Sequence, residues 1–149
     1  MSLQEKIMDA MKTAMKTKDT QSLEALRSVK SALLLAQTET GSKADLTEAE
    51  EIKLLQKQVK QRRDSAAIYK EQGREDLAEP ELVQAQVIEQ FLPKQLSEEE
   101  VGEIVDQIIT ETGASSMADM GKVMGLASAK VAGKADGKTI STLVKSRLS

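Results

Sequence analysis

The stretch Phe91-Leu92-Pro93-Lys94-Gln95-Leu96-Ser97-Glu98-Glu99-Glu100 divides this sequence into two sets of predicted helices. Proline disfavours helical geometry in the residue before it and has no backbone N–H group, so the helix that precedes Pro93 must stop there. Ser97, followed three residues later by Glu100, then matches a capping box, in which two side chains satisfy the first backbone groups of a helix. We therefore predict two domains that meet at this proline, over residues 1–92 and 93–149.

Start and stop signals of the same kind recur along the chain and predict seven helices and no strand. Ser2 with Glu5 and Thr47 with Glu50 repeat the start pattern. Glycines that can adopt a left-handed cap end the periodic segments at Gly41, Gly73, Gly113 and Gly133. The predicted helices cover residues 3–17, 20–38, 47–72, 97–112, 116–132 and 136–148, with one more that starts near Pro80, a favoured first helical residue. The predicted fold class is all-α, with an N-terminal bundle built around a long-helix hairpin and a small C-terminal three-helix module.

The composition limits the chemistry that this chain can perform. It contains no cysteine and no histidine, so thiolate nucleophiles, imidazole bases and the common zinc ligands are all missing. We therefore predict no catalytic residue, no cofactor, no metal site and no intrinsic enzymatic activity. The N-terminus lacks a basic segment followed by an apolar run, and no stretch approaches the roughly 20 apolar residues that span a bilayer. We expect a soluble cytoplasmic protein without a membrane partner.

Three short motifs resemble functional sites but are better explained as structure. Gly133–Thr139 has glycines and a lysine like a phosphate-binding P-loop, but it has one residue too few and follows a predicted helix. Gly113–Ser116 is interpreted as a glycine stop and a serine cap, and Glu98–Glu100 as acids that interact with a helix dipole. Met117, Met120 and Met124 share one helical face and are predicted to fill the core.

The distribution of charge is more informative than the net charge of −3. The C-terminal part of the chain, from residue 117 onward, holds six basic and two acidic residues. Its lysines either form a surface for phosphates or are simply solvated, and the candidates for contact with nucleic acid are Lys122, Lys130, Lys134 and Lys138. A second basic stripe lies between residues 53 and 63, where an ion-paired helix face is the favoured interpretation over an RNA surface.

The sequence of the C-terminal third resembles that of the GatB/YqeY family. The resemblance rests on residues 91–100, on Gly113-Ala114, on residues 118–125 and on residues 133–137, and the N-terminal stretches 26–30 and 60–65 are similar to free-standing YqeY-like members. The family motif residues are Asp119, Gly121, Gly125, Gly133, Asp136 and Gly137. The sequence departs from the family where members often read Met-Pro-Lys-Val-Lys-Gly, because residues 128–133 lack the proline and the second lysine. Without the proline, a continuous helix through Ala129 is expected.

The resemblance implies a two-part helical fold whose C-terminal module is shared with the tail of the B subunit of tRNA-dependent amidotransferases and with some glutaminyl-tRNA synthetases. Carbon–nitrogen ligase activity with glutamine as amido-N-donor is implied by this resemblance alone, since the chemistry belongs to other domains. The leading hypothesis is a non-catalytic tRNA-binding or amidotransferase-associated accessory protein, with an amidotransferase or a synthetase as its partner. The alternative is a protein-interaction adaptor that uses its long helical hairpin without contacting RNA.

Overall fold

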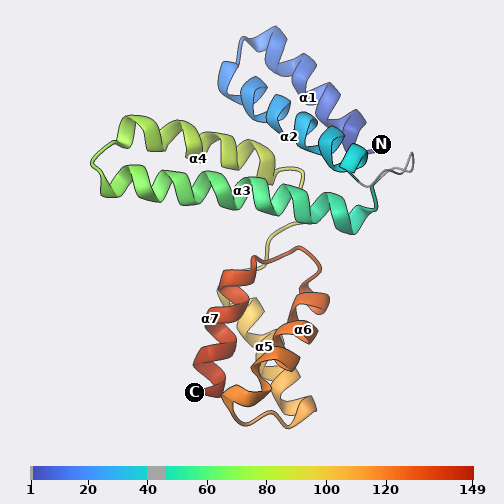
Figure 1. Cartoon of the computed structure of the whole chain (residues 1–149), viewed down its shortest axis with the longest axis vertical. Helices are drawn as coiled ribbons and strands as arrows, with labels where there is room; N and C mark the ends of the chain where they lie inside the picture. Colours follow the sequence, from blue (N-terminus) through green and yellow to red (C-terminus); the bar gives the residue numbers. More distant parts are fainter. Residues whose placement is uncertain (1, 40–45) are drawn as a thin grey trace. The chain divides into compact units, whose positions relative to one another are not determined.

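The structure is a computed structural model that describes residues 2–39 and 46–149 (Figure 1). Within these ranges the fold is all-α, as predicted, with seven α-helices, one short 3-10 helix and no strand. Residue contacts divide the chain into two compact units, Met1–Leu92 and Pro93–Ser149. The predicted glycine stop at Gly41 lies outside the described residues.

The first unit consists of two antiparallel helix pairs. Helices α1 (Leu3–Thr17) and α2 (Thr20–Glu39) form one pair, and the longer α3 (Glu48–Glu71) and α4 (Glu75–Glu89) form the other. The predicted caps begin two of these helices, because the side chains of Ser2 and Thr47 accept hydrogen bonds from the backbone N–H groups of Glu5 and Glu50. Helix α2 packs mainly against α1 and α4 and only slightly against α3.

Aliphatic side chains and alanines from all four helices fill the core of the first unit. Leu26 and Leu33 of α2, seven residues apart and so on one helical face, are buried together with Leu55 of α3 and Ile88 of α4. Each such side chain contributes about 1.5–3 kcal/mol when it is removed from water. Tyr69, the only tyrosine, is half-buried near the end of α3.

The start of α4 differs from the prediction, which placed it near Pro80. The helix begins at Glu75, so that Pro80 is its sixth residue. The turn before it is very short, because Gly73 takes a left-handed conformation with a φ of 72° just after the end of α3. Glu75 and Asp76 then provide the two acids that favour a helix N-terminus. The buried side of this helix is formed by Ala78, Ala85 and Ile88, while Leu82 and Val83 are half-buried.

The second unit is a three-helix module. Helices α5 (Glu98–Thr112), α6 (Met120–Val131) and α7 (Gly137–Leu148) each pack against the other two. The capping box predicted at Ser97 and Glu100 is complete, and Gly113 ends α5 with a φ of 70°. The buried side chains are mostly valine and isoleucine, such as Val105, Val123 and Ile140.

The helix predicted over residues 116–132 is interrupted near its start. A short 3-10 helix, η1 (Met117–Asp119), comes first, and α6 begins at Met120. Met117 is therefore 45% exposed, and the prediction that it fills the core was wrong, whereas Met120 and Met124 do pack against the core. Ser116 makes no side-chain cap, so that part of the predicted serine cap is also wrong. Helix α6 does continue through Ala129, as expected without a proline there.

Candidate nucleic-acid interface

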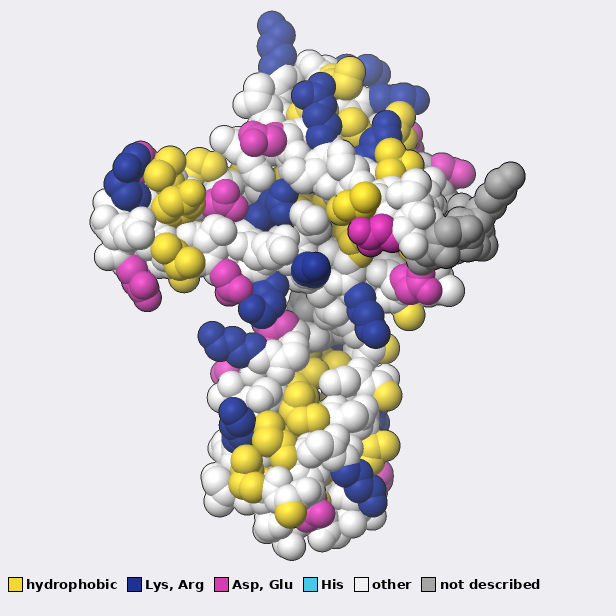
Figure 2. Space-filling model, viewed as in Figure 1, with side chains coloured by type: hydrophobic (Ala, Val, Ile, Leu, Met, Phe, Trp, Pro, Cys, Tyr) yellow, Lys and Arg dark blue, Asp and Glu magenta, His cyan; other side chains and the backbone are white. Residues whose placement is uncertain are grey.

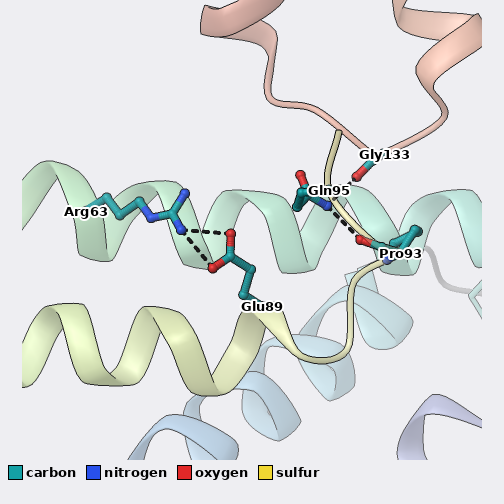
Figure 3. Close-up of polar contacts among 5 residues, drawn as sticks. All are labelled: Arg63, Glu89, Pro93, Gln95 and Gly133. Carbon is teal, nitrogen blue, oxygen red and sulfur yellow. Dashed lines mark hydrogen bonds and ion pairs between the residues drawn. The ribbon is translucent and has the colours of Figure 1, made fainter. Parts of the chain in front are cut away.

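The loop that joins α6 to α7 is held by hydrogen bonds from the segment that leads into α5. The side-chain amide of Gln95 donates to the carbonyl oxygens of Pro93 (2.8 Å) and Gly133 (3.1 Å), as Figure 3 shows. The backbone N–H of Leu96 donates to the carbonyl oxygen of Lys134 at 2.7 Å. These bonds hold the loop at Gly133 and at Lys134, so the lysines around it project from a defined backbone.

The turn itself uses two consecutive residues in the left-handed region. Ala132 has a φ of 45° and Gly133 a φ of 83°. The backbone N–H of Ala132 donates to the carbonyl oxygen of Ser128, which closes the end of α6. Asp136 then begins α7, because its side chain accepts a hydrogen bond from the backbone N–H of Thr139 at 2.7 Å. The motif that resembles a P-loop is thus a helix end, a turn and a helix cap.

Three of the four candidate lysines lie around this turn. Lys130 is in the last turn of α6, Lys134 is in the loop, and Lys138 is in the first turn of α7. We call these three residues the basic corner. All three side chains are exposed, and in the part of the chain that the structure describes none of them forms an ion pair. Lys130 donates to the neutral side-chain oxygen of Gln107 at 3.0 Å, so its charge is not neutralised.

Lys122 is also exposed but does not join the basic corner. It lies in the first turn of α6, eight residues before Lys130. At 1.5 Å of rise per residue, the two side chains start about 12 Å apart along the helix axis. The single patch of four lysines that the sequence suggested is therefore three lysines at one end of α6 and one lysine at the other.

The electrostatics of the basic corner are mixed. The N-terminal end of the α7 dipole lies beside Lys138, and the Asp136 carboxylate that caps it already places a negative charge there. Glu98, Glu99 and Glu100 occupy the first turn of α5, which follows the segment bonded to the loop. Glu100 is engaged in the capping box, and the hydrogen bonds from the backbone and side chain of Ser97 lower the pKa of its carboxyl group. The acids of this turn therefore stabilise the N-terminus of α5. They reduce the positive potential of the basic corner but form no ion pair with its lysines.

The family motif residues have distinct structural roles. Asp119 precedes α6, and its carboxylate accepts a hydrogen bond from the backbone N–H of Ser115 at 3.1 Å. Gly121 and Gly125 are one turn apart on the exposed side of α6, and a Cβ atom added at either would meet nothing within 4 Å. Each glycine costs about 1 kcal/mol relative to alanine inside a helix. No contact with the described residues requires a glycine at either position. Because both residues lack a side chain, the backbone of α6 is open there to close approach by another molecule.

The second basic stripe is neutralised only in part, because two of its five basic side chains form ion pairs with described residues. The Nζ atom of Lys60 pairs with Asp64 at 2.8 Å. The guanidinium of Arg63 donates to both carboxylate oxygens of Glu89, at 2.7 and 2.8 Å (Figure 3). Figure 2 shows basic and acidic side chains interspersed over the first unit on this face, without a large area of one sign.

The described residues offer no sign of a metal centre or of a membrane segment. No group of three or more acidic, histidine or cysteine side chains among them is placed to hold a metal ion. Within the same ranges, no helix has the length and the apolar character needed to cross a membrane.

The fold and this site define a two-unit, all-helical protein whose C-terminal three-helix module carries the basic corner. The chain belongs to the YqeY-like family, whose model, described as "Yqey-like protein", matches residues 4–148. It is also similar to the E subunit of glutamyl-tRNA(Gln) amidotransferase from two Thermococcus species. The identity is 44% over 73 residues for Thermococcus gammatolerans and 40% over 73 residues for Thermococcus sibiricus.

These matches cover 46% of this chain but only 12% of each amidotransferase subunit. The chain therefore corresponds to a small part of those relatives. The matched stretch is longer than the second unit, Pro93–Ser149, so the similarity is not confined to that unit.

Proposed function

We propose that this protein is a non-catalytic accessory protein that binds tRNA through the basic corner. The observation that carries the proposal is the presence of three exposed lysines without ion pairs, among the described residues, on a loop fixed by hydrogen bonds. The relatives, named as subunits of a glutamyl-tRNA(Gln) amidotransferase, point to tRNA as the RNA and to an amidotransferase as the protein partner.

The composition determines how such an interface works. The sequence contains one phenylalanine, one tyrosine and no tryptophan, and both aromatic residues precede the second unit. Proteins that read single-stranded RNA stack bases on aromatic side chains, and this module has none. Binding therefore depends on phosphates and on the shape of a folded RNA. The open backbone at Gly121 and Gly125 lets an RNA strand come closer to α6 than longer side chains would allow.

Titration of a tRNA transcript at several salt concentrations tests this proposal. Each phosphate contact releases counterions and steepens the dependence of affinity on salt, by a log-log slope of roughly 0.9 per contact on duplex DNA. The double variant Lys134→Glu, Lys138→Glu is expected to weaken binding strongly and to flatten the slope. The matched control, Lys53→Glu with Lys57→Glu, changes the net charge equally on the first unit and is expected to have little effect. Equal binding by the two variants would contradict the assignment, as would wild-type binding that is insensitive to salt.

A second candidate function is that of an adaptor that binds another protein, because apolar side chains are exposed near the tip of the long α3–α4 hairpin. Ile68 on α3 is 53% exposed and Leu77 on α4 is 38% exposed, on either side of the turn at Gly73. Exposed apolar side chains of this kind are suited to contact with another protein. If the hairpin docks an amidotransferase, the double variant Ile68→Asp, Leu77→Asp loses binding to the purified enzyme and keeps any affinity for tRNA.

A further inference from the structure

The arginines of the first unit are not all paired with acids. The chain has five arginines, and three of them form ion pairs: Arg63 with Glu89, Arg74 with Asp76 and Arg147 with Asp106. The remaining two are Arg27 on α2 and Arg62 on α3. Neither has an ion-pair partner among the described residues, and both line the same groove between α2 and α3.

Arg62 is held in place by neutral groups. Its Nη1 atom donates to the carbonyl oxygen (3.2 Å) and the side-chain oxygen (2.6 Å) of Gln58. Its Nε atom donates to the side-chain oxygen of Gln84 on α4 at 3.2 Å, and Gln84 in turn donates to Gln21 on α2 at 2.9 Å. Gln84 is the only polar residue among the buried residues of the described chain. A network across three helices therefore fixes this guanidinium.

This arrangement leaves one guanidinium nitrogen without a protein acceptor but open to solvent, since no buried side-chain nitrogen or oxygen of the described residues lacks a hydrogen-bond partner. Burial lowers the pKa of Arg62, while the negative charges of Glu81 and Glu24 act in the opposite direction. Removing a charge from water is costly unless a charged partner compensates, and the amide oxygens compensate only in part. No acceptor for the Nη2 atom is found among residues 2–39 and 46–149. The site therefore has an oriented donor group and a positive charge that is compensated only in part.

The groove provides further donors around this charge. Because α2 packs mainly on α1 and α4, it leaves α3 along part of its length and opens a space of about 790 Å³. Ser28 and Ser31 of α2 line this space on the same helical side as Arg27, and no hydrogen bond to another described residue engages any of these three side chains. Glu24 also lines it, and Glu81 acts on Arg62 from α4, so two acids offset the charges of the two arginines at this groove.

We propose that the groove between α2 and α3 is a phosphate-binding site. Arg27 and the Nη2 atom of Arg62 contact the phosphate oxygens, and the hydroxyl groups of Ser28 and Ser31 donate to the same group. Guanidinium groups match the geometry of phosphate oxygens and form strong, charge-assisted hydrogen bonds with them. The low net charge suits a phosphate monoester or diester better than a polyphosphate. The site is on the first unit, and its test uses no tRNA, so it stands or fails separately from the proposed function.

The stretches 26–30 and 60–65 that resemble free-standing YqeY-like members provide both arginines. They are about 30 residues apart in sequence, and the structure brings Arg27 and Ser28 of the first to the same groove as Gln61 and Arg62 of the second. A shared ligand gives one reason for two distant stretches to be lined up on one groove.

The test is a titration of the ¹⁵N-labelled full chain with inorganic phosphate at constant ionic strength, followed by NMR. We expect saturable shifts of amide signals in residues 27–31 and 58–62, and none when chloride replaces phosphate. Arg27→Gln is expected to weaken the apparent affinity about tenfold, or roughly 1.4 kcal/mol. Arg74→Gln is the matched control, because it removes one exposed arginine charge elsewhere on the same unit. Arg27 is exposed and makes no hydrogen bond to another described residue, so its loss is not expected to affect folding.

Two further arms define the ligand. Succinate at the same ionic strength tests the class of anion, and equal binding of this dicarboxylate would overturn the assignment to phosphate. Competition by a dinucleoside monophosphate identifies a phosphodiester of nucleic acid as the source, whereas its failure to compete identifies a free phosphate or a monoester. The proposal is wrong if phosphate causes no saturable shift in the groove, or if Arg27→Gln and Arg74→Gln bind phosphate equally well.

Discussion

Gln95 ties the segment before α5 to the loop at Gly133, because its side-chain amide donates to the carbonyl oxygen of Gly133 as well as to that of Pro93. Replacement by alanine leaves both carbonyl groups, which are partly shielded from solvent, without this donor. We expect Gln95→Ala to lower the free energy of unfolding of the second unit by about 1–2 kcal/mol. Thermal unfolding followed by circular dichroism measures this change. Gln107→Ala removes an exposed glutamine of the same unit and should have a much smaller effect.

Ala132 occupies a left-handed conformation that L-amino acids with a Cβ atom disfavour by roughly 1–2 kcal/mol. Ala132→Gly is therefore expected to stabilise the second unit, by up to about 1 kcal/mol after the entropy cost of glycine. Gly133→Ala places the same strain at the next residue, where φ is 83°, and is expected to destabilise the unit. Chemical denaturation of both variants checks the sign. A loss of stability in Ala132→Gly would show that the backbone at this turn differs from the one described.

Glu100 makes the stability of α5 depend on pH, because its pKa is lowered by the capping hydrogen bonds of Ser97. A carboxyl group with a lowered pKa in the folded state stabilises that state above its ordinary value of 4.5, and this contribution is lost as the pH falls through the folded-state pKa. Glu100→Gln keeps a capping side chain but does not titrate. The melting temperature of the wild type is expected to fall more steeply than that of the variant when the pH is lowered from about 5 toward about 3. Parallel pH profiles would contradict this role.

The second unit has its own core, and side chains cap the N-termini of α5 and α7, so we expect residues 93–149 to fold when expressed alone. The expected result is a helical circular dichroism spectrum with a cooperative thermal transition. A disordered fragment would show that the three-helix module depends on the first unit.

Local signals were sufficient to predict most of the helices. Ser2, Thr47 and Ser97 each cap a helix, because the side-chain oxygen accepts a hydrogen bond from the backbone N–H three residues later. This hydrogen bond is local in sequence and does not depend on tertiary contacts. The sequence misplaces the start of α4, because Pro80 also fits the preference for proline at a first helical residue. Glu75-Asp76, directly after the Gly73 stop, was the signal that could have located it.

The site depended more on packing than the helices did. The sequence predicts that Lys122 lies with the other three lysines. The structure separates it from them, because Lys122 and Lys130 lie at opposite ends of α6. The groove at Arg27 and Arg62 could not be predicted from residues 26–30 or from residues 60–65 alone. It forms because α2 packs mainly against α1 and α4 and only slightly against α3.

The position of Tyr69 on α3 gives the protein an intrinsic optical label for one unit. There is no tryptophan, so the ultraviolet emission of the whole chain is dominated by this single phenol ring in the first unit. Far-ultraviolet circular dichroism, in contrast, records helices of both units. A denaturation curve in which the emission and the helical signal change together would mean that the two units unfold as one cooperative system. Two separate midpoints would identify, without any mutation, which unit melts first.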